Sequence, residues 1–500
     1  MSESYINLNE FAAAREQFEY LANNLESGEM TGWQHSDVEA WISTEGTELM
    51  RRLLQGYLDL QGKNEKVLEI APGADGVIRN HRRQGCGRSL MSLFGQVRVN
   101  RKGYGQRGET SLFPLDGVLN LPGDKYSHGL RRRVAEEVSR GSFDAGVERV
   151  TRTTGGKVPK RQAEELAWRA ADDFELFYET RVTEAADLTS DPLIISVDGK
   201  GIVMRPEGLR EVTRKASERD KHKLKTRLSK GEKRNRKRMA TVAAVYSIEQ
   251  QVRTAEEIMN LTDRPAKQIR PRARDKRVWA SVEREPETVI EEAVREALFR
   301  DPGQRRAWAI LIDGQEQQLW NIESCLAKHR LSATIILDFI HVLEYLWKAA
   351  YCFEEEGSEA AETWVAARAK RILEGRASDV AAGIRRSATL KGLNAQERKP
   401  ADTCADYLLK YSDLLKYDQY LADGLPIATG VIDGACRHLI KDRMDITGAR
   451  WGLSSAEAIL KLRSLQSSGD FEDYWDFHLE QEFADNHLSC YKKFPLVYAA

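Results

Sequence analysis

An ordered series of extended and helical segments between residues 191 and 353 most constrains how this chain can fold. Three extended runs, "PLIISVDGKGIVM", "MATVAAVYSIE" and the weaker "QVRTAEEI", precede the helical "PETVIEEAVREALF". Two further apolar runs follow, "RAWAILID" and "SATIILDF", and each leads into a segment with helical periodicity. Apolar, β-branched runs of this length are typical of strands buried in a sheet. The pattern therefore predicts an α/β domain.

The order of these elements, three strands, a helix, a strand, a helix, a strand and a helix, is that of the RNase H-like fold. In such a sheet the first strand lies beside the fourth, and here those two runs end on Asp198 and Asp313, each followed by glycine. Neighbouring strands are about 4.8 Å apart, so we expect the two carboxylates to lie close together. Carboxylates placed in this way can bind two metal ions for phosphoryl displacement. Oxygen ligands favour Mg²⁺, for which Mn²⁺ can substitute.

A single Asp-Gly pair after a strand usually marks a turn. Two such pairs, after the first and fourth strands, are better explained by a metal-binding site than by two turns. Asp338 ends the next strand, in "TIILDFIH", and we expect it to flank the metal ions. With His341 it forms a D-x-x-H pattern. In the alternative interpretation Asp338 only caps the following helix, and His341 is a hydrogen-bonded core residue.

A third carboxylate is expected from a helix in "GVIDGACRHLIKDRM". At helical spacing Asp433, Arg437 and Lys441 share one face, which offers one metal ligand and two cations for phosphate. A surface helix with salt bridges would show the same pattern of charged residues. The prediction therefore depends on Asp433 lying near Asp198 and Asp313 in the fold. We therefore predict that Asp198, Asp313 and Asp433 are both the catalytic residues and the metal ligands. Glu457, in "SSAEAIL", is the nearest substitute acid.

The rest of the chain divides around this core. Residues 1–83 are predicted to form a helical N-terminal region, and 84–190 a β-ribbon followed by a helix-turn-helix. The catalytic core is predicted in two parts, 191–353 and 426–500, the second with C-terminal helices. Between them, 354–425 reads as an Ala- and Arg-rich helical insertion.

The helix-turn-helix is indicated by two helical segments, "SFDAGVERVTRTTG" and "KVPKRQAEELAWR", joined at a Gly-Gly turn. Pro159 lies near the start of the second helix, as is common at helix N-termini. This helix would bring Lys160, Arg161 and Gln162 to the major groove of DNA. A plain three-helix bundle with a basic surface remains the alternative.

A basic arm is predicted at residues 205–238. From Arg214 to Arg238 it holds thirteen Lys and Arg against three acids and has no apolar periodicity. Such a segment indicates a loop that contacts phosphates, although a solvated helix face would have a similar composition. The residues expected to contact DNA are Arg234, Arg236, Lys237 and Arg238.

Composition limits the partners and the cellular compartment that we expect for this chain. The net charge of −1 gives no overall attraction to nucleic acid, so binding must come from such local charge segregation. No apolar run approaches the roughly 18 residues that cross a bilayer, and the N-terminus lacks the apolar core of a signal peptide. We expect a cytoplasmic protein without membrane contact. The six cysteines form no C-x-x-C pair, which disfavours a structural zinc site.

Five stretches together resemble bacterial insertion-sequence transposases of the ISKra group over about residues 84 to 490. They are "FPLDGVLNLPGDKYSHGLRRRVAEE", "VDGKG", "LIDG", "DFIHVLEYLW" and "GVIDGACRHLIKDRMDITGARWG". These DDE enzymes, related to Mutator-type transposases, have an RNase H-like core broken by a helical insertion. By resemblance Asp198 and Asp313 are the first two acids, and Asp338 with His341 is the D-x-x-H. The third acid is normally Glu, where this chain has Asp433.

The resemblance implies a transposase that binds the terminal inverted repeats of its insertion sequence and uses two Mg²⁺ ions for DNA cleavage and strand transfer. Its partner would be double-stranded DNA, both element ends and target, bound by a homodimer or a larger synaptic complex. Because Asp is one methylene shorter than Glu, the carboxylate retreats by about 1 Å, which can cost roughly a hundredfold in rate. Two alternatives follow: an RNase H-like nuclease without strand transfer, and a transposase-derived DNA-binding protein without catalysis.

Overall fold

The computed structural model describes residues 8–181, 189–219, 234–259 and 271–492. The chain divides into two compact units, one of Met1–Thr180 with Asp470–Ala500 and the other of Arg181–Gly469. We call them the terminal unit and the core unit. The sequence assigned all of 426–500 to the core, whereas the segment from Asp470 belongs to the terminal unit.

The core unit is built on one mixed sheet with the strand order β11-β10-β7-β8-β9. β8 is antiparallel to β7 and β9, while β10 and β11 run parallel to β7. The first strand therefore lies beside the fourth, as the element order predicts. The strands are β7 (Leu193–Val203), β8 (Lys237–Ser247), β9 (Arg274–Ser281), β10 (Trp308–Ile312) and β11 (Thr334–Leu337).

The third strand is not where the sequence analysis placed it. Within "QVRTAEEI", residues 251–254 are irregular and Ala255–Met259 form helix α9, so that prediction is wrong. The strand is instead β9, whose first three residues are exposed and charged and whose last five, from Arg277, are buried. The short apolar stretch in "RVWAS" follows a run of charged residues. The segment as a whole therefore does not show the pattern of a buried strand.

Helices cover this sheet. α10 packs against β7 and β8, and α17 against β7, β8 and β9, while α19 packs along β9. The bounds are α10 (Pro286–Arg300), α11 (Glu316–His329), α12 (Phe339–Ala350), α17 (Gly430–Ala435), α18 (Asp442–Met444) and α19 (Leu453–Ser468).

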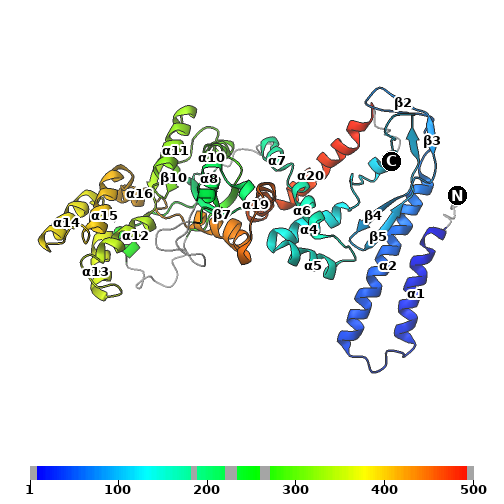
Figure 1. Cartoon of the computed structure of the whole chain (residues 1–500), viewed down its shortest axis with the longest axis horizontal. Coiled ribbons are helices and arrows are strands. Elements are labelled where there is room, and N and C mark those ends of the chain that lie inside the picture. The colour runs from blue at the N-terminus through cyan, green and yellow to red at the C-terminus, as the bar shows by residue number, and fades with distance from the viewer. Residues whose placement is uncertain (1–7, 182–188, 220–233, 260–270, 493–500) are drawn as a thin grey trace. The chain divides into compact units, whose positions relative to one another are not determined.

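Residues 354–425 form the predicted helical insertion. Within the core unit its helices group at one end, beyond the edge strand β11 and next to α12 (Figure 1). They are α13 (Glu359–Leu373), α14 (Ala377–Leu390), α15 (Lys399–Lys410) and α16 (Tyr417–Ala422).

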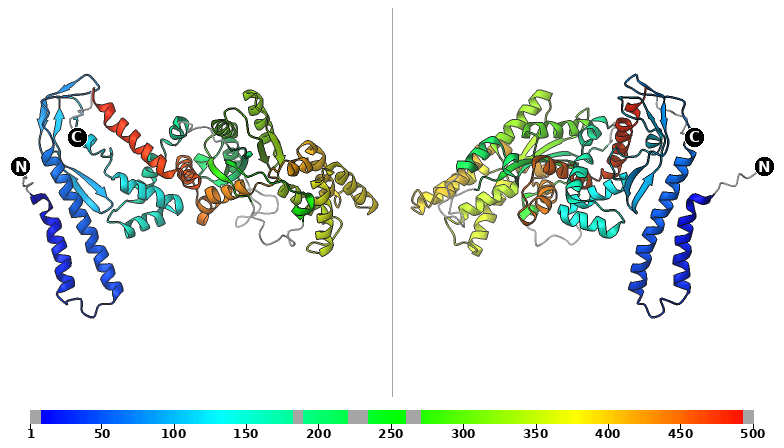
Figure 2. Two further views of the ribbon diagram at one scale, coloured as in Figure 1. Left: turned by 180° about the vertical axis from the view of Figure 1, so that it is seen from behind. Right: turned by 45° about the vertical axis from the view of Figure 1, so that its right-hand side comes forward.

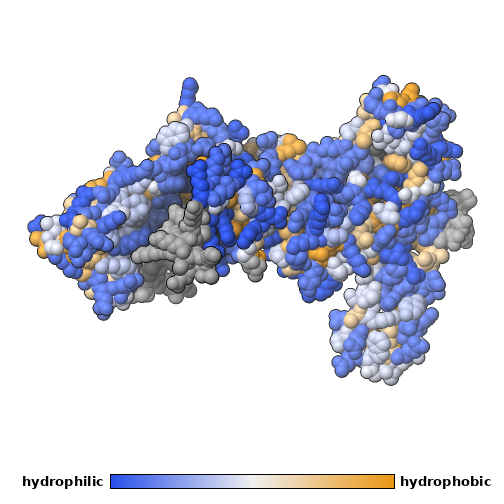
Figure 3. All heavy atoms as spheres, in the orientation of Figure 1, coloured by the Kyte–Doolittle hydropathy of each residue, from blue (hydrophilic) through white to orange (hydrophobic). Residues whose placement is uncertain are grey.

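The terminal unit begins with a long helical hairpin, α1 (Ala12–Glu26) and α2 (His35–Asn64), whose helices lie side by side in every view (Figure 2). Few of its side chains are buried, and its distal surface is pale rather than strongly hydrophilic (Figure 3). The predicted helical region 1–83 ends early, because strands begin at Ala71. These are β1 (Ala71–Pro72), β2 (Ile78–Arg79) and β3 (His81–Arg83).

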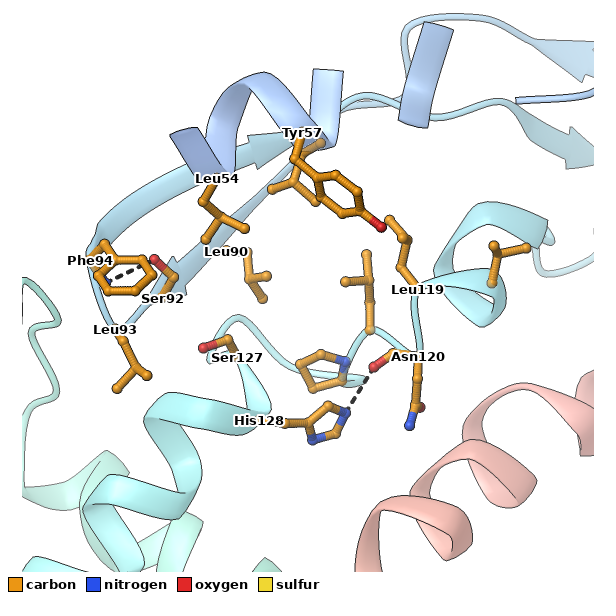
Figure 4. A pocket seen from close by; sticks show the side chains of 14 residues that line it. Leu54, Tyr57, Leu90, Ser92, Leu93, Phe94, Leu119, Asn120, Ser127 and His128 are labelled. Atoms are coloured by element: carbon orange, nitrogen blue, oxygen red, sulfur yellow. Dashed lines mark hydrogen bonds between the residues drawn. The ribbon is translucent and has the colours of Figure 1, made fainter. Parts of the chain in front are cut away.

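The predicted β-ribbon is present as β4 (Arg88–Ser92) and β5 (Gly95–Val99), which pair antiparallel across a two-residue turn. β3 pairs with β6 (Gly103–Gly105). The alternating residues of β5 are buried and exposed in turn, as a half-buried strand requires. An apolar pocket of about 440 Å³ is lined by α2, the ribbon and residues 118–122 and 127–128, with His128 among the lining side chains (Figure 4). Burial, followed by the charge of Arg131, lowers the pKa of His128 to about 4.

Short helices complete the terminal unit: α3 (Pro114–Val118), α4 (His128–Arg140), α5 (Phe143–Thr153), α6 (Lys160–Arg169) and α7 (Phe174–Thr180). α4 packs against both α5 and α6. The C-terminal helix α20 (Phe471–Asn486) joins them, since the Tyr474 hydroxyl donates to the carbonyl of Ala170 at 2.9 Å. The His478 ring also binds the Asp173 carboxylate at 2.6 Å. These contacts explain why the segment from Asp470 groups with the N-terminal residues.

Among the helices the structure describes, none is both long and apolar enough to cross a membrane.

Candidate active site

Three acids occupy aligned positions on three neighbouring parallel strands. Asp313 and Asp338 directly follow β10 and β11, whereas Asp198 lies within β7, which continues to Val203 instead of ending at the acid as the sequence analysis expected. β10 pairs with β7 so that Leu311 lies opposite Ser196, and continuing this register aligns Asp313 with Asp198. The register between β10 and β11 likewise aligns Asp313 with Asp338. Equivalent positions on parallel strands face the same side at a spacing of about 4.8 Å. The sheet therefore gathers these carboxylates at one edge, with Asp313 in the middle.

Asp338 is the most enclosed of the three acids. It is fully buried, and one of its oxygens accepts from the backbone N–H of Ile340, which caps α12. Its other oxygen accepts from the Thr429 hydroxyl and from Nδ1 of His341, the latter at 3.2 Å. Its carboxylate therefore both caps a helix and orients His341. The hydrogen bond that His341 makes to the Asp338 carboxylate raises the pKa of His341 to about 9, which favours the protonated ring.

Asp433 approaches these acids from helix α17. Burial, followed by the charges of Asp338 and Asp198, raises the pKa of the Asp433 carboxyl, while His341 and Lys200 oppose the shift. The side chain is thus within electrostatic reach of the strand acids yet exposed to solvent. An acid in this position is open to ligands and costly to leave unneutralised.

The segment around Asp433 departs from the regular helix that the sequence predicts. α17 passes into a π-helical turn, η4 (Cys436–Lys441), before α18 begins. The wider turn removes the strict stripe expected for Asp433, Arg437 and Lys441, although both cations remain exposed. Arg437 makes an ion pair with Asp442 at 3.5 Å. π-Turns occur frequently at functional sites.

The donor set fits Mg²⁺ or Mn²⁺, because Asp198, Asp313 and Asp433 offer carboxylate oxygens that are not buried. Their ligand atoms do not form a group within 4.8 Å, however. One ion with oxygen ligands at about 2.1 Å needs those oxygens within about 4.2 Å of one another. A pair of ions about 3.5 to 4 Å apart would be held by a wider set of carboxylates.

One group in the described ranges does place three ligand atoms within 4.8 Å, namely Glu291, Cys325 and His329. The Glu291 carboxylate already binds Nε2 of His329 at 2.6 Å and the Lys328 ammonium at 3.0 Å. Burial alone would raise the pKa of Glu291, but these hydrogen bonds outweigh it and lower the pKa to about 2. The group is thus an ion-pair network between α10 and α11.

Glu457, the substitute acid considered from the sequence, lies elsewhere. It is buried on α19, and its Oε2 accepts from the backbone N–H groups of Val282 and Glu283 at 2.9 and 3.1 Å. These bonds satisfy the backbone just beyond β9. Glu457 therefore stabilises the sheet, and its oxygen is not free to bind a metal ion.

Sequence reasoning missed several residues at the acid edge. The Cys436 thiol donates to Oδ2 of Asp198 at 3.1 Å, although the sequence analysis gave Cys436 no role. From the insertion, the hydroxyls of Tyr407 and Tyr411 donate to the carbonyls of Asp313 and Gly314, at 3.3 and 2.6 Å. Cys436 is three residues after Asp433, and this helical spacing could have indicated that both side chains face the acids. The tyrosines are distant in sequence and gave none.

The backbone conformation and close packing after Asp313 both require glycine at position 314. Gly314 has φ of +90°, which side-chain-bearing residues rarely adopt. A Cβ there would also lie 2.9 Å from Leu337 and 3.1 Å from the Tyr407 hydroxyl. Gly199, after Asp198, has no positive φ. The two Asp-Gly pairs thus look alike in sequence but differ in what the glycine does.

The predicted recognition residues lie on the first turn of α6 in the terminal unit. Lys160 pairs with Asp144 at 2.6 Å, and Gln162 donates to Glu165 at 2.9 Å. Arg161 is 90% exposed and forms a longer ion pair with Glu165, at 3.4 Å. The start of α6 thus presents polar side chains to solvent, and each of its two cations has an acidic partner.

The basic arm is described only in part, since residues 220–233 lie outside the described ranges. Its first part contains the exposed helix α8 (Glu211–Arg219), so the expectation of a loop is wrong there. Arg234, Arg236 and Lys237 are exposed. Arg238 instead donates to the carbonyls of Val282 and Glu283, at 2.7 and 3.1 Å, which ties the start of β8 to the end of β9.

No known protein family and no curated protein matches this sequence. Among solved structures, the strand transfer complex of the Drosophila P element transposase matches at 11% identity with a TM-score of 0.24. The match covers 72% of this chain and 80% of that one. A TM-score this low does not indicate a shared fold.

Proposed function

We propose that this chain is a DDE transposase of the ISKra type with an RNase H-like core. The observation that carries the proposal is the alignment of Asp198, Asp313 and Asp338 at one edge of the sheet, with Asp433 brought toward them by α17. An ordinary turn would place one acid after one strand. Four carboxylates converging from separate elements are costly to keep together unless cations bind them.

In this proposal Asp198, Asp313 and Asp433 would hold two Mg²⁺ ions, or Mn²⁺, which stabilise charge on the attacking and leaving oxygens of an in-line displacement at phosphorus. Asp338 keeps His341 protonated and fixed, so that a cation faces the phosphate region. Lys200 adds further positive charge near Asp433, and the exposed Arg437 and Lys441 would contact DNA phosphates. Catalysis then consists of positioning and charge neutralisation.

The reaction we assign is hydrolysis at the end of the element followed by transfer of the freed end. Water attacks the phosphorus and displaces the 3′-oxygen of the element end. The resulting 3′-hydroxyl then attacks a phosphodiester of target DNA, whose own 3′-oxygen leaves as a hydroxyl. The first turn of α6, with Lys160, Arg161 and Gln162, would read the terminal inverted repeats in the major groove. Because two ends must be joined to one target, we expect a dimer or a larger assembly on DNA.

The test uses the purified chain with duplexes made from the DNA that flanks its gene. With Mg²⁺ we expect cleavage at the repeat boundary and joining of pre-cut ends to a plasmid. Asp198→Asn and Asp313→Asn should abolish both reactions while end binding persists. Cleavage without joined products would instead support a nuclease.

Asp433 favours one further candidate, because a Glu is normal at that position of the resembling transposases. End binding without cleavage in either Mg²⁺ or Mn²⁺ would identify a transposase-derived DNA-binding protein.

A further inference from the structure

A cavity of about 800 Å³ lies in the core unit where β7 ends and β8 begins. Four parts of the core unit line it: the end of β7, Thr213 on α8, residues 234–237, and residues 445 and 448–450. Backbone hydrogen bonds join three of these parts, from Met204 N–H to the Arg236 carbonyl at 2.9 Å and from Trp451 N–H to the Val203 carbonyl at 3.1 Å. These three parts of the wall are therefore fixed by the fold.

The lining of this cavity is strongly cationic. Arg234, Arg236, Lys237 and Arg450 line it, against the single carboxylate of Asp445. All five side chains are exposed. Within the described part of the chain, no acidic side chain pairs with any of the four cations. Clustered cations without counter-charges attract anions and lose bound counterions when a polyanion binds.

The same lining indicates which part of a nucleic acid it would contact. Its described residues include no aromatic side chain on which a base could stack. Guanidinium groups, an ammonium group and the hydroxyl of Thr213 are instead the donors that bind phosphate oxygens. The cavity thus suits the sugar-phosphate backbone and carries no base-reading chemistry.

The distance from the acids follows from the strand. Val203, in the cavity wall, is five residues beyond Asp198 on β7. At about 3.3 Å per residue this is roughly 17 Å. One strand of B-DNA has a phosphate for about every 3.4 Å of helix axis, so 17 Å corresponds to about five nucleotides.

We propose that this cavity, with Arg450 as a member that the basic arm does not include, binds the phosphate backbone of duplex DNA about five nucleotides from the phosphodiester held at the acid edge. The backbone site rests on the cavity itself. The spacing of five nucleotides rests on the proposed function of the acids.

The first experiment measures binding of the full chain to a random-sequence duplex over a range of salt concentrations. Arg450→Gln should reduce the slope of log K against log salt by about 0.9, one phosphate contact. The matched control is Arg305→Gln. Arg305 is another exposed arginine of the core unit and precedes the start of β10, whereas Asp313 follows its end, so this substitution should leave the slope unchanged. Equal slopes for Arg450→Gln and the unmodified chain would overturn the site.

A second variant tests the sign of the charge effect. Asp445→Asn removes the one carboxylate in the lining and should strengthen binding about fivefold at low salt, the equivalent of roughly 1 kcal/mol of relieved repulsion. Weaker or unchanged binding would contradict the proposal. A gain in affinity cannot come from a variant that merely unfolds.

The spacing is tested with pre-cut element ends that carry one neutral methylphosphonate linkage at each of the first ten positions. Substitution near the fifth position should weaken binding by the unmodified chain and have no effect on Arg450→Gln. If no methylphosphonate position weakened binding but Arg450→Gln still reduced the salt slope, the backbone site would stand and the placement of the DNA end at the acids would be rejected. If neither effect occurred, both would be rejected.

Discussion

Asp433 differs from the other acids in how it is positioned, because it reaches the edge of the sheet from a helix and remains exposed. The length of its side chain is therefore a variable that the strand acids do not share. Asp433→Asn should abolish metal-dependent cleavage and leave end binding intact. Asp433→Glu should raise cleavage above that of the natural chain, by up to roughly a hundredfold if about 1 Å of reach is restored. Cleavage of labelled duplex, with circular dichroism of each variant, measures both effects.

Glu457→Gln provides the control, because Glu457 is held by two backbone N–H groups outside the acid edge. We expect a lower melting temperature, from weakening of hydrogen bonds worth about 1 to 3 kcal/mol, but unchanged cleavage per folded molecule. If Glu457→Gln abolished cleavage while Asp433→Asn spared it, the third ligand would have to come from α19.

A buried carboxylate on α10 makes the stability of the core unit depend on pH. Burial alone would raise the pKa of Glu296, but the charges of Arg277, Arg300 and Arg181 outweigh it and lower the pKa to about 2. A pKa below the unfolded value of about 4.5 means that its stabilising contribution is complete above that pH. The contribution is lost as the pH falls from about 4.5 toward 2.

Glu296→Gln should therefore lower the free energy of unfolding at pH 7 by roughly 3 to 5 kcal/mol, because it leaves three arginines without their common partner. It should also flatten the dependence of stability on pH between 4.5 and 2. Urea denaturation of both proteins across that range measures the difference. Parallel pH profiles for the two proteins would show that Glu296 is not the group responsible.

At the scale of single elements, the sequence predicted most accurately where apolar runs were long. β10 is buried along its whole length, β7 and β8 combine a long buried segment with exposed residues, and β11 is half buried; the order of these runs placed β7 beside β10. β9 failed because only its second half is apolar. The π-turn of η4 could not be anticipated, since a run such as "CRHLIK" is equally compatible with a regular α-helix. Asp338 was placed correctly at a strand end, but its bond to Thr429 depends on a tertiary contact across the insertion.

The first turn of α6 carries a prediction about sequence preference. Arg161 is exposed and pairs with Glu165 at 3.4 Å, Gln162 is partly exposed, and Lys160 is held more closely by Asp144 at 2.6 Å. Arg161→Ala should reduce the preference for terminal repeats over random DNA by about 1 to 3 kcal/mol, since contacts to base edges provide specificity. Competition binding with both DNAs measures the ratio, and Arg133→Ala on α4 is a control for general loss of charge. A preference that survived Arg161→Ala and Gln162→Ala together would exclude this helix from base reading.

At the scale of the whole molecule, the division into units could not be derived from the sequence. A helical pattern at 471–486 fits equally well after the core or against the N-terminal helices. The choice is made by contacts more than 300 residues apart, such as Tyr474 with Ala170 and His478 with Asp173. Such pairs leave no local pattern, because each partner alone is an ordinary residue of an amphipathic helix.

This division predicts that damage in one unit stays within it. Tyr474 and Leu460 are both fully buried, on α20 in the terminal unit and on α19 in the core unit. Tyr474→Ala removes an aromatic ring packed against Phe177, and Leu460→Ala leaves a cavity in the core, so each should cost about 2 to 5 kcal/mol. In hydrogen exchange read by mass spectrometry, Tyr474→Ala should speed exchange in α4, α6 and α7 and leave β7 and β8 protected. Leu460→Ala should do the reverse, with faster exchange in β9 and its neighbours. If either substitution accelerated exchange equally in both units, they would form one cooperative structure and the assignment of α20 to a separate unit would be wrong.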